Sequence, residues 1–175
     1  MANQEHFAML MQEVERWNRW KESTRGAIDP DLRYANLQGL NLSGYDLSGV
    51  QFHGANLSRA DLSETDLGGA DFSEANLSEA NLSNTDADSA NFTKSMLVNA
   101  NLTKASLTKA NLMQANLSKA HLSETDFRAA DISTANFSGA VIDNTDFRKA
   151  ILHPTSPIDA NFSSVDLSQT FFTEK

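Results

Sequence analysis

Large apolar residues recur at every fifth position over most of the chain. From Leu32 to Phe172 the series has 29 positions, of which 27 are Leu, Phe or Ile, and only Ala87 and Pro157 depart from it. The position two residues before the large one is Ala in 17 of 29 repeats, and most of the others have Thr, Ser or Val there. Asp or Asn lies between the small and the large residue in 21 of 29 repeats. Small or polar residues complete each repeat.

A period of five fits neither an α-helix nor a simple strand. In a helix, successive large residues would be 500° apart and would spread around the whole circumference. The pattern instead predicts a very short strand that turns two alternate residues inward, followed by a corner built from Asp, Asn, Ser and Gly. The large residue then fills the axis of a coil, and the small residue allows close approach beside it.

The repeat A-(D/N)-L-(S/T)-x, as in ADLSE at 60–64 and ANLSE at 75–79, resembles the pentapeptide-repeat proteins. This resemblance covers about residues 30–174. It implies an all-β solenoid, a right-handed quadrilateral β-helix of about seven coils with inward stacks of Leu and Phe. Residues that this fold would place in the core include Leu57, Phe72, Leu102 and Leu122.

A coil of twenty residues has independent support in the sequence. Thr replaces the inward Ala at multiples of twenty, at Thr65, Thr85, Thr125 and Thr145. Phe recurs at the same interval, at Phe52, Phe72 and Phe92. Four repeats per coil would place these residues in columns, whereas three or five would scatter them.

The segment before the repeats has a different pattern. Phe7, Leu10, Met11, Val14 and Trp17 follow helical spacing, which predicts one amphipathic helix over residues 4–22. We expect residues 1–29 to form a helix and linker that cap the open edge of a β-helix at 30–175. Attachment to a membrane or to a partner is the alternative role. The run WNRWK at 17–21 resembles the helical segment ahead of the repeats in some cyanobacterial family members.

Corner residues change along the chain. Gly39, Gly44, Gly49 and Gly54 share one repeat position and predict type II turns with positive φ in the first coil. Later repeats have Glu, Lys, Asn or Ser there, which predicts a different corner geometry. Near the end, Pro154 and Pro157 predict a distorted corner.

Two aromatic residues close the repeat region. Phe171 and Phe172 would either cover the last rung of a monomer or form an end-to-end homodimer through the C-terminal coil.

The sequence contains no recognisable catalytic, cofactor-binding or metal site. It has no Cys, no phosphate-binding or nucleophile-elbow motif, and four His without a ligand partner at a useful spacing. The axis is expected to be filled, which leaves no concave pocket for a substrate. The net charge of −9 disfavours nucleic acid as a partner, and no apolar run is long enough for a membrane span or an export signal. We therefore expect a cytoplasmic protein that is not an enzyme.

Outward apolar departures from the repeat indicate one candidate surface. Met96 replaces Asp or Asn, and Val98 and Met113 replace Ser or Thr near what we expect to be one corner. Exposed apolar clusters commonly mark contacts with a partner, whereas drift at a tolerant position is the simpler explanation. Lys94, Lys104, Lys109 and Lys119 should form a girdle around the rod, with Glu74 below Lys94 and Lys104 below Glu124.

These features favour a non-catalytic protein-binding or scaffold module of the bacterial cytoplasm, with an unidentified protein partner. The alternative comes from the resemblance, because some family members bind DNA gyrase by imitating DNA. Residues 1–90 hold 15 acidic and 6 basic residues, whereas 91–175 hold 8 of each. Only the first half therefore has the negative charge that such imitation requires.

Overall fold

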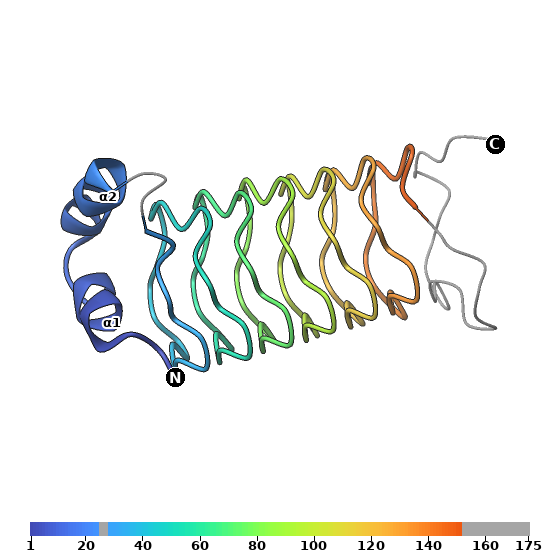
Figure 1. Cartoon of the computed structure of the whole chain (residues 1–175). Coiled ribbons are helices and arrows are strands. Elements are labelled where there is room, and N and C mark those ends of the chain that lie inside the picture. The colour runs from blue at the N-terminus through green and yellow to red at the C-terminus, as the bar shows by residue number, and fades with distance from the viewer. Residues whose placement is uncertain (25–27, 152–175) are drawn as a thin grey trace.

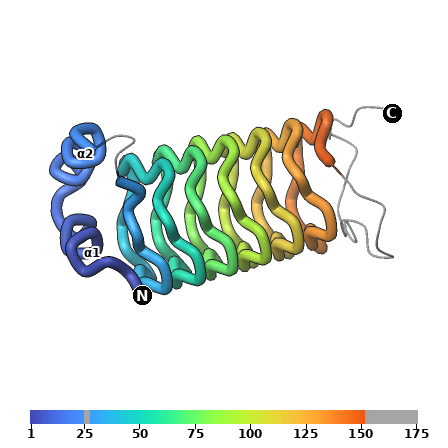
Figure 2. The backbone as a smooth tube through the Cα atoms, viewed as in Figure 1, coloured from blue at the N-terminus to red at the C-terminus, as the bar shows by residue number. Residues whose placement is uncertain are grey.

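The chain winds into a rod of stacked square coils. The computed structural model describes residues 1–24 and 28–151. In these residues, helices α1 (Gln4–Leu10) and α2 (Val14–Ser23) lie against one end of the rod (Figure 1). Parallel bridges join residues twenty positions apart, from Asp31 and Gln51 to Asp131 and Ile151. The twenty-residue coil predicted from the Thr and Phe columns is thus confirmed, and the backbone tube in Figure 2 shows it repeating along the axis.

Each five-residue repeat contributes the same hydrogen bonds. In the repeat that begins at Asn56, the Leu57 amide donates to the next coil at Asn76 O (2.8 Å), and the Arg59 amide donates to Ser78 O (2.9 Å). The Ala60 amide closes the turn on Leu57 O (3.0 Å). We call residue 56 and its equivalents the bridging position, residue 57 the axial position, and residues 58–59 the corner.

Every described corner has the same backbone geometry. The second corner residue has positive φ in all repeats from Tyr34 to Lys149, in eighteen non-glycine residues and six glycines. The expectation that corners without Gly differ is therefore wrong. The left-handed conformation costs a non-glycine residue about 1 kcal/mol. The bridging side chain helps to offset this cost: Asn56 Oδ1, for example, accepts from the Ser58 amide (3.2 Å).

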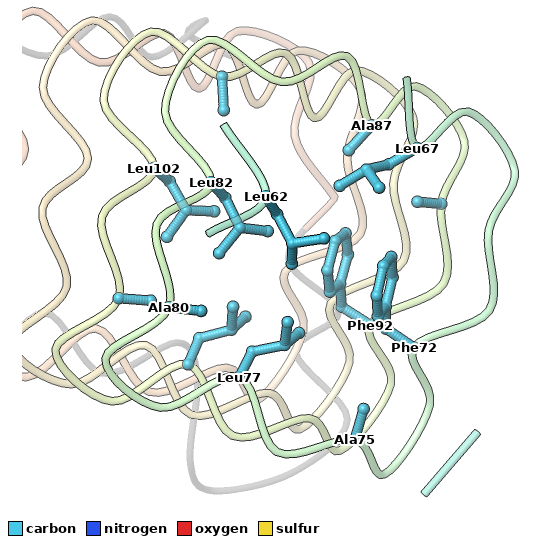
Figure 3. Close-up of a cluster of buried hydrophobic side chains, with 14 of the residues drawn as sticks. Leu62, Leu67, Phe72, Ala75, Leu77, Ala80, Leu82, Ala87, Phe92 and Leu102 are labelled. Carbon is cyan, nitrogen blue, oxygen red and sulfur yellow. The ribbon is translucent and has the colours of Figure 1, made fainter. Parts of the chain in front are cut away.

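The axial residues fill the rod with layered columns. Leu57, Phe72, Leu102 and Leu122 are all fully buried, as the repeat predicts. Phe52, Phe72 and Phe92 form one aromatic stack, with ring centroids 4.8 and 5.1 Å apart. Ala87, the break in the large-residue series, is buried at the axial position, and Figure 3 shows it beside Leu67 of the preceding coil.

The inward Thr residues are buried and make hydrogen bonds. Thr85 Oγ1 donates to Leu82 O of its own coil (2.9 Å), whereas Thr125 Oγ1 donates to Leu102 O of the preceding coil (2.8 Å). The hydroxyl therefore has a partner in both halves of the rod, although the partner differs.

The N-terminal segment forms two helices, so the expectation of one helix over residues 4–22 is wrong. Helix α1 ends at Leu10, and Glu13 lies extended before α2. The hydroxyl of Tyr45, from the first coil, donates to Gln12 O between the helices (2.8 Å). This contact with the solenoid holds the break in place. Met11 is consequently 53% exposed rather than on the buried face.

The helical segment makes the bonds that a preceding coil would make. At Asp46, the amide donates to Asn18 Oδ1 (2.8 Å), and the carbonyl accepts from Trp17 Nε1 (2.6 Å). At Asp31, the amide donates to His6 Nδ1 (2.9 Å), and the carbonyl accepts from the Asn3 amide (2.9 Å). Two sides of the first coil thus have their edge groups paired.

Candidate functional site

One face of the rod carries a ladder of Asn residues that a single Met interrupts. We call it the Met96 face, and its bridging positions are Asn36, Asn56, Asn76, Met96, Asn116 and Asn136. Asn56 Nδ2 donates to Asn36 Oδ1 below it, and Asn136 Nδ2 donates to Asn116 Oδ1, both at 3.3 Å. Met96 is 48% exposed and has no amide with which to continue the ladder. An apolar side chain therefore faces solvent in the middle of a polar column.

The other two predicted residues lie on either side of this face. Val98 is half-buried at the corner that follows Met96, and its carbonyl accepts from the Glu79 amide (2.9 Å). Met113 is half-buried at the preceding corner, one coil further along, where its carbonyl accepts from the Lys94 amide (2.9 Å). The structure thus places Val98 and Met113 at two successive corners that flank the Met96 face, rather than near one corner.

A buried polar atom lies next to Met96. Ser95 occupies the inward position that is Ala in the coils above and below, and only 1% of it is exposed. Within the described residues, its Oγ has no hydrogen-bond partner. A buried hydroxyl without a partner costs about 1–3 kcal/mol. Ser95 and Met96 therefore both depart from the residue types that stabilise the coil. Such departures are typical of functional sites.

The lysine girdle has the predicted pairing. Lys94 Nζ lies 3.8 Å from Glu74 Oε1, and Lys104 Nζ lies 3.8 Å from Glu124 Oε2. All four side chains are more than half exposed, so each pair contributes only a few tenths of a kcal/mol.

A cluster of basic residues lies at one corner and was missed in the sequence, where only the lysines from Lys94 to Lys119 were considered. Lys109, Arg128, Arg148 and Lys149 line a surface hollow of about 530 Å³, together with Thr108 and Ala129. We call this set the Lys109 corner. Because each coil has twenty residues, residues 129 and 149 lie directly above residue 109. Reading the sequence at intervals of twenty would have revealed the cluster.

The face opposite Met96 is acidic. Its bridging positions are Asp46, Asp66, Asp86, Ser106, Asp126 and Asp146. Arg148 holds the pKa of Asp146 below its usual value through a hydrogen bond and its charge. The Arg128 side chain pairs with Asp126 through Nη2 and Oδ2 at 2.7 Å. Arginines therefore neutralise Asp126 and Asp146 in the later part of this column. In its first part, Asp46 and Asp66 are followed instead by uncharged corner residues, Ser48, Gly49, Gly68 and Gly69.

Asp31 and Asp88 are among the other carboxylates with lowered pKa values. A hydrogen bond from Arg33 lowers the pKa of Asp31 to about 2. The hydroxyl of Thr108, which bonds to Asp88, lowers the pKa of that carboxylate. Both carboxylates are therefore charged at neutral pH.

The remaining sequence predictions concern the C-terminal residues, metal binding and membrane crossing. Phe171, Phe172, Pro154 and Pro157 lie outside the described residues. Among the described residues, no group of three His, Asp or Glu side chains is arranged to hold a metal ion. None of the helices in that part of the chain is long and apolar enough to cross a bilayer.

Solved structures of pentapeptide-repeat proteins are similar to this chain. A trypsin-treated variant of QnrB1, a plasmid-mediated fluoroquinolone resistance protein, matches with a TM-score of 0.57 and 22% identity, over 77% of this chain and 76% of that chain. HetL, involved in heterocyst differentiation regulation in the cyanobacterium Nostoc sp. strain PCC 7120, matches with a TM-score of 0.38 and 24% identity, over 85% and 81% of the two chains. Among curated proteins, none matches the chain.

The QnrB1 match shows the fold, which is the right-handed quadrilateral β-helix that the repeat implied. The model of the family described as pentapeptide repeats matches residues 31–63, 55–93, 95–133 and 115–153, in eight copies. These ranges cover well over half of the sequence. The chain therefore belongs to the pentapeptide-repeat family.

Proposed function

We propose that the chain is a non-catalytic protein-binding or scaffold module of the bacterial cytoplasm that acts through the side of its rod. The observation that carries this proposal is Met96, an exposed apolar residue in a column of Asn. Replacing it with Asn would extend the ladder and remove apolar surface from water, so coil stability alone does not favour Met there. Contact with an apolar group of a partner protein would account for an exposed Met at position 96.

The solenoid suits such a role. Its coils bond to neighbouring coils along the whole described length, so the side of the rod is a rigid surface. A rigid surface loses little conformational entropy when it binds. The Met96 face offers one apolar residue at its centre, two half-buried apolar residues at its corners, and polar residues around them.

The test is capture of a partner from a native lysate, followed by site-specific crosslinking. We expect Met96→Asn combined with Val98→Ser and Met113→Ser to remove the captured protein. Val141→Asn is the matched control, because Val141 is also an exposed apolar residue at a bridging position, on another face. Equal capture by the triple variant and the wild type would contradict the proposal, and so would equal loss in the control.

A second candidate function is imitation of DNA toward DNA gyrase. The acidic column from Asp46 to Asp86 favours it, because its carboxylates repeat at the spacing of the coils. The basic Lys109 corner, adjacent to the later part of the same face, opposes it. A gyrase supercoiling assay with and without a quinolone separates the two functions: protection of gyrase by the wild type, reduced by Asp66→Asn and Asp86→Asn, would favour imitation of DNA.

A further inference from the structure

The Lys109 corner brings four cationic side chains together on three successive coils. The Lys109 amide donates to Arg128 O (3.0 Å), and the Ala129 amide donates to Arg148 O (3.1 Å), so the backbone of these coils is locked in register. Adjacent coils are about 4.8 Å apart, which places Lys109 and Lys149 about 10 Å apart along the axis. The cationic groups thus form a short strip parallel to the rod.

Charge changes sign along this corner. Gly68 and Gly69 carry no side-chain charge, Asp88 is acidic, and the corner becomes basic from Lys109 onward. The Thr108 hydroxyl bonds to Asp88 at the boundary. Asp88 would repel an acidic ligand that extended toward the front of the rod, so such a ligand would be confined to the three basic coils.

Aspartates hold the arginines in place. Arg128 Nε and Nη2 bond to the Asp126 carboxylate at 2.9 and 2.7 Å, and Arg128 Nε lies 3.8 Å from Asp146 Oδ2 in the next coil. A guanidinium has five N–H donors, and the contacts within the described residues use two of them, which leaves three, including both on Nη1, for another acceptor. Because the guanidinium is already oriented, little side-chain entropy remains to be lost on binding.

Ala129 makes the strip concave. It is the one Ala among the described corner residues with positive φ, and it gains neither the conformational freedom of Gly nor a polar contact from that position. Lys109 and Lys149 flank it on the coils below and above, and the three residues line the hollow. The small side chain therefore leaves space between two cations.

We propose that the Lys109 corner binds an acidic, extended segment of a partner protein, with carboxylates about three residues apart. An extended peptide in the polyproline II conformation rises about 3.1 Å per residue and has three residues per turn, so carboxylates three residues apart lie on one face and span the distance between Lys109 and Lys149. The carboxylates bind the two lysines and Arg128, and the backbone between them lies over Ala129. This surface is separate from the Met96 face and does not depend on its role.

The test is fluorescence anisotropy with the full chain and a labelled short peptide that has Asp at every third position. We expect the peptide to bind at low salt, to be released by high salt, and to bind about tenfold more weakly to Lys109→Glu. Lys119→Glu is the matched control, because Lys119 has the same corner position at the diagonally opposite corner and the same change in charge.

Ala129→Glu provides a second test, since it fills the hollow and adds a negative charge. Glu already occupies this corner position at Glu64, Glu74, Glu79 and Glu124 with the same positive φ, so the coil accepts it. We expect the same loss of peptide binding as for Lys109→Glu. Equal binding by the wild type, Lys109→Glu and Ala129→Glu would overturn the proposal. Tighter binding of inorganic phosphate or an oligonucleotide at the same residues would also overturn it, because the occupant would then not be a protein.

Discussion

The axis and the outer surface of the same coils follow different rules. At the axis, Phe72 and Leu102 are fully buried, and each axial side chain is part of one continuous apolar core. On the outside, the bridging position accepts Asn76, Met96 and Asn116 in one column without any change in backbone pairing. The repeat therefore determines the fold through its inward residues and leaves the outward residues available for function.

The largest effect is expected when the same charge is placed at the axis and, in a second variant, on the outer surface. Leu102→Asp buries a carboxylate without a partner, and we expect it to cost more than about 4 kcal/mol and to unfold neighbouring coils. Ser118→Asp puts Asp at an outward corner position that Asp88 already occupies, and it should change stability by less than about 0.5 kcal/mol. Thermal melting followed by circular dichroism measures both; equal effects would show that axis and surface are not distinct.

The next largest effect is expected at the helical end. Trp17 is fully buried, and its indole N–H bonds to the edge carbonyl of Asp46. We expect Trp17→Ala to cost about 3–5 kcal/mol through the cavity and the lost bond. Trp20→Ala, at a partly buried residue, is the control and should cost less. Hydrogen exchange should then accelerate first at the Asp46 amide, and unchanged protection there would show that the helices do not secure the edge.

The sequence predicted the solenoid because its axial pattern is repeated many times. The coil length, the buried Thr column and the Phe stack follow from one period, and each repeat confirms the next. The break between α1 and α2 could not be predicted, since Tyr45 of the first coil stabilises it. The uniform corner was missed because the φ of Glu or Lys there depends on bonds to the next coil and to the bridging side chain, not on the propensity of the corner residue.

The candidate surfaces were predicted only in part. Met96 was found as a departure from the pattern, which needs no structure. The Lys109 corner was missed because its basic members lie twenty or forty residues apart, at two neighbouring positions of the repeat. The unpaired Oγ of Ser95 could not be foreseen either, since Thr85 at an equivalent inward position does find a partner.

A smaller change in stability is expected at Ser95. We expect Ser95→Ala to stabilise the rod by about 1 kcal/mol, because the buried hydroxyl has no partner among the described residues. Thr85→Ala is the counterpart and should destabilise it by about 1 kcal/mol, because it removes a made hydrogen bond and a buried methyl group. Urea unfolding measures both, and a loss of stability in Ser95→Ala would show that the hydroxyl is bonded after all.

Acid should produce a smaller loss at the first coil. The pKa of Asp31 in the folded chain is about 2, below its value of 3.8 in an unfolded chain, so its ion pair with Arg33 stabilises the fold above about pH 4. That contribution is lost as the pH falls from about 4 to about 2. Arg33→Ala should flatten this part of the stability profile, whereas Arg59→Ala, which breaks a pair with Glu79, should leave the Asp31 contribution intact. Identical profiles for the wild type and Arg33→Ala would exclude this contribution.

The most direct measurement compares stability and partner capture in one variant, Met96→Asn. We predict a melting temperature that is unchanged or slightly higher, because Asn at this position adds an amide to the column of Asn side chains, together with loss of the captured protein. Unchanged capture with unchanged melting would contradict the account, since Met96 would then be only a tolerated substitution on the surface of the rod.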